Sequence, residues 1–154
     1  MAYLILKALH ILGAMVLLGT GLGIAFFLYR ANGTRDLKVI SFAARQTVLA
    51  DQIFTLPAVI LTPVTGFFLA RQAGYSLASG WLMVSLVLFV VAGACWVPAA
   101  NLQTRMRNLA QSAVQENREL PIDYWHHARR WFLLGVAAFP AAILIFVLMI
   151  FKPF

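Results

Sequence analysis

A histidine within a long apolar run is the residue of this chain best suited to chemistry. Residues 2–29 (AYLILKALHILGAMVLLGTGLGIAFFLY) are almost entirely apolar, and they contain one cation, Lys7, and one histidine, His10. About 20 apolar residues cross a hydrocarbon core of roughly 30 Å, so this run is predicted to be a membrane-spanning helix. An ionisable group is costly inside such a helix, which favours a functional role for His10.

The spacing of small residues places a groove beside this histidine. At about 100° per residue, Gly13 and Gly21 fall on the His10 face of the helix, while Gly19 and Gly23 form a GxxxG pair on the opposite face. Small residues let a neighbouring helix or a flat ligand approach closely. Two interpretations of His10 stay open: a ligand of a metal or cofactor, or a histidine that forms a hydrogen bond across the helix bundle.

The composition is typical of an integral membrane protein. Of 154 residues, 62% are hydrophobic and 11% are charged, and the mean hydropathy is +0.86. We predict an all-α four-helix bundle in one transmembrane domain, residues 1–154, with spans at about 3–29, 53–70, 82–100 and 132–151. Residues 37–52 carry cations between apolar positions, so they are predicted to form a helix along or into the membrane interface.

The charges predict the orientation of these helices. The net charge is +7, and most cations follow the first span or lie between the third and fourth spans: Arg30, Arg35, Lys38, Arg45, Arg105, Arg107, Arg118, Arg129 and Arg130. The positive-inside rule then places both termini outside, on the periplasmic side of a bacterial inner membrane. These cations are expected to face lipid headgroups, so we predict the lipid bilayer and no nucleic acid as the partner.

Alternating helix directions determine which side chains share the depth of His10. The end of the second span and the start of the third return to its layer, and there the chain carries Arg71 and Met83. A His/Met axial pair holds haem iron in some cytochromes. We therefore consider His10 as the metal ligand, Met83 as a second ligand, and Arg71 and Lys7 as partners of haem propionates.

Three other polar residues are interpreted as structural. Asp51, which precedes the second span, is expected to be an interfacial carboxylate paired with Arg130 or Arg30, because no other acid lies in or beside a span to form a relay. His126 and His127 diverge by about 100° on a helix, whereas helical metal pairs use i,i+3 or i,i+4 spacing. We predict that these histidines belong to a basic aromatic collar at the cytoplasmic interface.

The ends of the chain carry a family resemblance. The opening YLILKALHILG and the closing FKPF resemble the HemJ-type protoporphyrinogen oxidases and the related copper-resistance-D-like membrane proteins. The segments PAVILTPVTGFFLA and GWLMVSLVLFV resemble the second and third helices of HemJ. The whole chain is also similar to a family of uncharacterised bacterial four-helix membrane proteins. The resemblance to HemJ implies a b-type haem at His10.

Two departures from the HemJ pattern bear on activity. Where HemJ has Trp-Leu-His-x-Lys, this chain continues from Trp81 and Leu82 to Met83, Val84 and Ser85. The polar Asn-Glu-x-Pro feature is replaced by VAAFP, which ends at Pro140. These departures argue against protoporphyrinogen oxidation and leave haem binding as the expectation. The chain also lacks nucleotide motifs, HExxH, CxxC and a catalytic triad, which disfavours hydrolytic chemistry.

The sequence thus predicts a haem b-binding inner-membrane protein with a role in electron transfer or porphyrin redox chemistry. A haem-dependent oxidoreductase is the enzyme class that this implies, with a redox partner or quinone and with self-association through small-residue faces. The alternative is a non-catalytic membrane assembly or partner-binding protein in which His10 is structural. A transporter is disfavoured, because few polar groups converge within the spans.

Overall fold

The computed structural model describes residues 1–153, and all regular structure in that range is helical. The elements are α1 (Ala2–Thr34), α2 (Leu37–Ala50), the π-helical segment η1 (Asp51–Thr55), α3 (Leu56–Gln72), α4 (Gly80–Gln115) and α5 (Ile122–Phe151). Four helices are long enough to cross a membrane, and each contains an 18-residue stretch with a mean hydropathy between 2.0 and 2.8. The predicted all-α membrane bundle is therefore confirmed, whereas the span limits and the orientation of the termini stay predictions.

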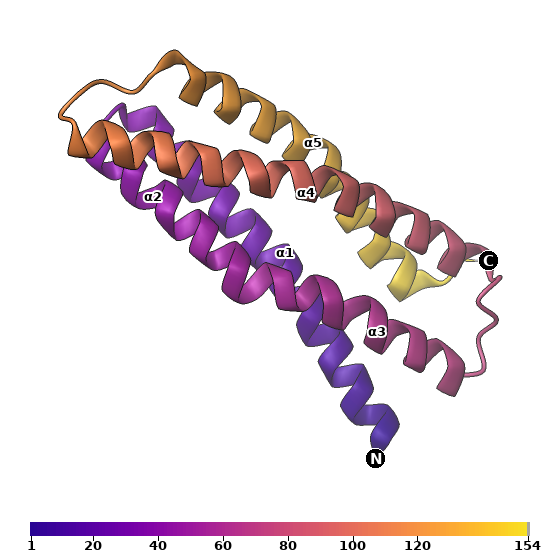
Figure 1. The fold of residues 1–154 in the computed structure, drawn as a ribbon. Helices are drawn as coiled ribbons and strands as arrows, with labels where there is room; N and C mark the ends of the chain where they lie inside the picture. The colour runs from indigo at the N-terminus through magenta and orange to yellow at the C-terminus, as the bar shows by residue number, and fades with distance from the viewer. Residues whose placement is uncertain (154) are drawn as a thin grey trace.

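The second of these four helices is longer than the sequence pattern indicated. Helix α2, η1 and α3 continue into one another as a single helix, Leu37–Gln72, of 36 residues (Figure 1). Helix α2 packs against α1 and α4, and its buried residues are Ile40, Ala44, Thr47 and Val48. These positions follow i, i+4, i+7 and i+8, the spacing of one buried helical stripe. Residues 37–50 therefore form part of the bundle.

Local capping explains the sharp turn between α1 and α2. Arg35 adopts a left-handed backbone conformation with φ 59°, which ends α1. The next residue, Asp36, is the N-cap of α2, and its carboxylate accepts hydrogen bonds from the backbone N–H groups of Lys38 at 2.8 Å and Val39 at 3.3 Å. An aspartate N-cap satisfies amides that a helix start leaves free. The turn therefore directs α2 back along α1.

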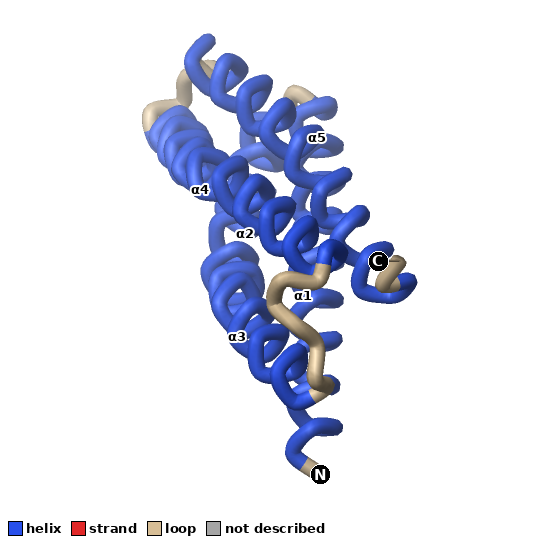
Figure 2. Tube along the Cα trace, turned by 90° about the vertical axis from the view of Figure 1, so that its right-hand side faces the viewer, coloured by secondary structure: helices blue, strands red, loops and turns tan. Residues whose placement is uncertain are grey.

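The best-packed part of the molecule lies where the end of α1, α2, the second half of α4 and the start of α5 meet. Leu28, Ile40, Met106 and Tyr124 are all fully buried there. The Tyr124 hydroxyl donates a hydrogen bond to Asn32 Oδ1 at 2.7 Å and ties α5 to α1. We call this region the distal core, because it lies at the end of the bundle away from the termini (Figures 1 and 2).

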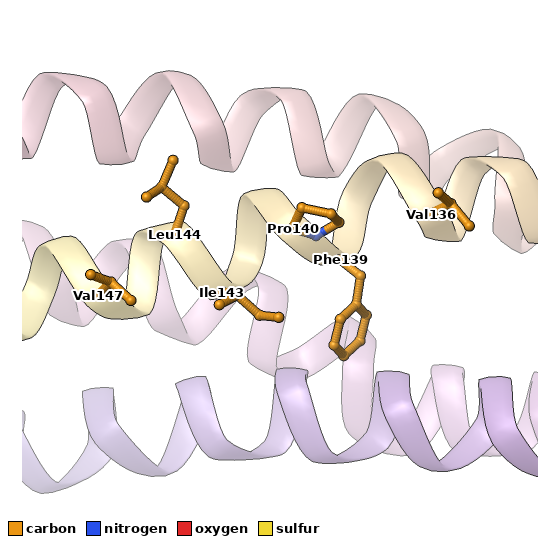
Figure 3. A pocket seen from close by; sticks show the side chains of 6 residues that line it. All are labelled: Val136, Phe139, Pro140, Ile143, Leu144 and Val147. Atoms are coloured by element: carbon orange, nitrogen blue, oxygen red, sulfur yellow. The ribbon is translucent and has the colours of Figure 1, made fainter.

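Toward the termini the bundle separates into two helix pairs. The main packing pairs are α1 with α3 and α4 with α5, and both views show these pairs diverging at that end (Figures 1 and 2). A shallow, open apolar groove of about 510 Å³ lies along α5 and is lined by Val136, Phe139, Pro140, Ile143, Leu144 and Val147. Phe139 projects from α5 toward α1 (Figure 3), where its ring approaches Gly21. The α1–α3 pair carries His10.

Candidate functional site

His10 is anchored to α3 through one nitrogen of its ring. Its Nδ1 atom lies 2.9 Å from the backbone oxygen of Thr62 and 3.2 Å from the hydroxyl oxygen of Thr65. A carbonyl oxygen can only accept a hydrogen bond, so Nδ1 must carry the proton. The Thr65 hydroxyl donates its own proton to Leu61 O at 2.7 Å and therefore accepts from His10 as well. In the neutral ring this tautomer leaves a lone pair on Nε2.

A glycine on α3 provides the space in which the ring lies. A Cβ atom built at Gly66 would lie 2.9 Å from His10 Cε1, 3.3 Å from Nδ1 and 3.7 Å from Nε2. Contacts under 3.0 Å are sterically excluded, so the imidazole rests where a side chain of residue 66 would otherwise be. The ring is half-buried, and the hydrogen bonds found for it in residues 1–153 both involve Nδ1. Its Nε2 atom therefore has no hydrogen-bond partner among the described residues.

Gly13 brings α1 and α3 together one turn away from His10. A Cβ atom at Gly13 would lie 2.5 Å from the Thr62 hydroxyl oxygen, which is buried and has no hydrogen-bond partner in the described part of the chain. The sequence predicted Gly13 on the His10 face, and the structure places both residues against α3. Gly19 and Gly23 have no atom within 4 Å of an added Cβ, so the GxxxG seam is not used within the monomer.

We predict that Gly13→Ala destabilises the α1–α3 pair by about 1–3 kcal/mol, the usual cost of overpacking. Thr62→Ala alone should cost much less, because the hydroxyl that it removes has no partner. In the double variant Gly13→Ala/Thr62→Ala the clash is relieved, so most of the lost stability should return. A double-mutant cycle of SDS-induced unfolding measures this coupling, and additive losses would contradict the packing described here.

The other predicted site residues lie nearer to the termini than His10. Lys7 is one turn before His10 on α1, and Arg71 follows Gly66 by five residues on the antiparallel helix α3. At 1.5 Å per residue these offsets are about 4.5 and 7.5 Å along the helix axes, toward the same end of the bundle. Both side chains are exposed, and the Arg71 guanidinium lies 5.8 Å from the Phe67 ring centroid. Along the helix axes, both cations therefore lie between His10 and the end of the bundle that carries the termini.

Met83 belongs to the other helix pair. It lies near the start of α4 with 48% of its surface exposed, and α4 packs mainly against α5 and α2. The structure thus brings Lys7 and Arg71 toward the His10 end of the α1–α3 pair, but it does not place Met83 in that pair. A second ligand for a metal at His10 stays a prediction.

The structure does not show the predicted ion pair between Asp51 and an arginine. The Asp51 side chain is 5% exposed, and within residues 1–153 it forms no salt bridge with Arg30, Arg130 or another cation. The prediction was wrong because α2 and α3 are continuous, so Asp51 lies inside a long helix and not at a helix entry. Asp51 also begins the π-helical segment, in which the Leu56 N–H binds Asp51 O. Such segments are frequent at functional sites.

Three polar side chains surround this carboxyl group. Thr55 comes from η1, and Trp96 and Gln103 come from α4; we call the four residues the Asp51 cluster. Thr55 and Gln103 are about 5% and 4% exposed. Asp51 Oδ2, the Thr55 hydroxyl and Trp96 Nε1 are buried without a hydrogen-bond partner in the described chain. The polar atoms therefore lie close together, but they do not form a complete hydrogen-bond network.

The sequence reasoning missed both Gly66 and the Asp51 cluster. A Thr-Gly pair within an apolar span and an Asp-Thr pair at i,i+4 were the available signals, but neither identifies a partner on another helix. Across residues 1–153 no three His, Cys, Asp or Glu side chains gather into a metal-binding group. A metal at His10 would thus need its remaining ligands from a cofactor or from other residue types.

The comparison with protein families agrees with the fold. The family model described as a predicted integral membrane protein (DUF2269) matches residues 4–153, nearly the whole chain. No curated protein and no solved structure matches the chain.

Proposed function

Because the chain belongs to the DUF2269 family of predicted integral membrane proteins, we propose a function that operates within the bilayer: binding of haem b through Nε2 of His10. The observation that carries the proposal is the hydrogen bond from His10 Nδ1 to Thr62 O at 2.9 Å. Metal-binding histidines usually donate their second ring N–H to a carbonyl or carboxylate, which fixes the tautomer and orients the ring. His10 has this arrangement before any ligand is added.

The surroundings of His10 suit a histidine that would hold a haem. Gly66 leaves the ring room beside α3, and the exposed cations Lys7 and Arg71 lie toward one end of the helix pair, where propionates would be bound. The flanking helices are apolar, which suits a porphyrin face. The residues present therefore fit a haem with one protein ligand. Met83 is the proposed second ligand, and it would reach the haem when the two helix pairs approach each other.

Haem would supply one-electron redox chemistry, while this chain would hold and orient it. The resemblance of YLILKALHILG and FKPF to HemJ supports a role in electron transfer or porphyrin redox chemistry in a bacterial inner membrane. A quinone or a redox protein would be the electron partner. No carboxylate that could accept a substrate proton lies next to His10 in the sequence, so the proposal does not include protoporphyrinogen oxidation.

The visible absorption spectrum of protein purified in detergent from haem-replete cells tests this function. We expect a Soret band in the wild type that His10→Ala abolishes. His126→Ala is the matched control, because His126 is exposed at the opposite end of the bundle and should leave the band unchanged. Size-exclusion chromatography establishes that each variant is folded. Colourless wild-type protein, or an unchanged band in His10→Ala, would overturn the proposal.

A second function is favoured by the same hydrogen bond. Because His10 joins α1 to α3, its role can be structural in a non-catalytic assembly or partner-binding protein, as the sequence analysis allowed. In that case the purified protein is colourless, and His10→Ala lowers the stability of the α1–α3 pair. The absorption spectrum therefore separates the two functions, since only the first requires a chromophore.

A further inference from the structure

The Asp51 cluster contains a carboxyl group without a compensating charge. Asp51 is 5% exposed, and its Oδ2 atom has no hydrogen-bond partner in the described chain. It faces Trp96, which lies inside the predicted span 82–100, whereas Asp51 and Gln103 lie just outside the predicted spans 53–70 and 82–100, so the cluster is expected at the edge of the membrane-spanning region. An isolated carboxylate is strongly disfavoured in an apolar environment unless it is paired. Ionisable residues at this depth usually mark ion or proton sites.

Protein cations do not neutralise this carboxyl group. The elements that pack around η1 are α1, α2 and α3, and α4 contributes Trp96 and Gln103. Among the described residues, no cationic or histidine side chain of these four helices forms a salt bridge with Asp51. The side chains of this kind are Lys7, His10, Arg30, Lys38, Arg45, Arg71, Arg105 and Arg107. An ionised Asp51 would therefore have no ion-pair partner among the described side chains of this monomer.

The oxygen atoms of the Asp51 cluster indicate which kind of cation would suit the carboxyl group. Carboxyl, hydroxyl and amide oxygens of Asp51, Thr55 and Gln103 are hard donors, which suit small hard cations. A single carboxylate balances a single positive charge, so a divalent ion would remain half-compensated. A bridging water could satisfy the unpartnered polar atoms, but it would leave the charge in place. The cluster therefore fits a monovalent cation better than a divalent ion or water alone.

We propose that the Asp51 cluster, at the junction of η1 and α4, is a binding site for a small monovalent cation, either a proton or Na⁺. The carboxyl group takes up the cation, and Thr55 and Gln103 provide the neighbouring oxygens. The π-helical turn presents Asp51 to α4 from within a continuous helix. This site is separate from His10 and does not depend on haem binding.

Two measurements on the purified full-length protein distinguish the two cations. Thermal unfolding is compared in NaCl and in choline chloride at equal ionic strength, and infrared spectra record whether the Asp51 carboxyl group is protonated at neutral pH. If Na⁺ is the ligand, NaCl raises the Tm of the wild type, and Asp51→Asn abolishes this response. If a proton is the ligand, NaCl has no specific effect, and the wild type shows a protonated carboxyl signal that Asp51→Asn removes.

The control is Asp123→Asn, because Asp123 is exposed on α5 and should change neither result. Should Asp51→Asn not fold, Thr55→Val and Gln103→Leu keep the acid and remove one neighbouring oxygen each. Each should shift the Na⁺ or proton midpoint about tenfold, the effect of losing one interaction with a charged group. An ionised Asp51 at neutral pH without any Na⁺ response would overturn the proposal.

Discussion

Tyr124→Ala should destabilise the protein by about 3–5 kcal/mol, the range for truncating a large aromatic side chain in a core. Tyr124 is fully buried in the distal core, where Leu28, Ile40 and Met106 are fully buried as well. Its ring centroid also lies 5.2 Å from that of Trp125. The alanine variant would leave a cavity at the meeting point of four helices, and SDS-induced unfolding measures the loss.

The location of Tyr124 explains why this effect should be so large. The residue precedes the predicted span 132–151, so we expect the distal core to extend beyond the hydrocarbon region into an aqueous environment. Burial of apolar surface is driven by water there, whereas helices within lipid associate through packing and hydrogen bonds alone. The stability of the monomer is therefore expected to depend most on the distal core.

Two further variants separate packing from hydrogen bonding at this position. Tyr124→Phe keeps the ring and removes only the hydrogen bond to Asn32, so it should cost about 1 kcal/mol. Tyr29→Ala is the control, because that side chain is 61% exposed and should have a small effect. Equal losses for Tyr124→Ala and Tyr29→Ala would show that the distal core does not dominate stability.

The four-helix membrane fold could be predicted because it depends on the length of apolar segments. Segments near 3–29 and 132–151 reach or exceed the length needed to cross a bilayer, and this property can be counted in one sequence. The continuity of α2 with α3 was less accessible. The cations Lys38 and Arg45 interrupt the apolar pattern, and only packing against α1 and α4 shows that the opposite face is buried.

Some residues of the candidate sites could also be predicted from the sequence, and others could not. His10 could be identified because an ionisable residue in an apolar run is conspicuous, and the position of Gly13 on the His10 face follows from helical spacing. Asp51 was misinterpreted because the continuity of α2 with α3, which places Asp51 inside one long helix, has no clear sequence signal. Gly66 was missed because its role depends on a ring from another helix, 56 residues earlier in the chain.

Gly66→Ala should displace the His10 ring and destabilise the α1–α3 pair by about 1–3 kcal/mol. The added methyl group would lie 2.9 Å from Cε1, so the ring or the helix must move. Any movement lengthens the hydrogen bond from Nδ1 to Thr62 O, which is 2.9 Å in the wild type. Under the haem proposal, the Soret band should therefore weaken or shift, although residue 66 itself carries no ligand atom.

A glycine in open surroundings provides the matched comparison. Gly135→Ala adds the same methyl group within α5, where no atom lies within 4 Å of the new Cβ, so it should leave the spectrum unchanged and should not lower stability. In His10→Ala the imidazole is absent, and Gly66→Ala should then cost little because the clash has gone. If Gly66→Ala costs as much stability in the His10→Ala background as in the wild type, Gly66 is needed for close packing of the helices and not for the placement of the ring.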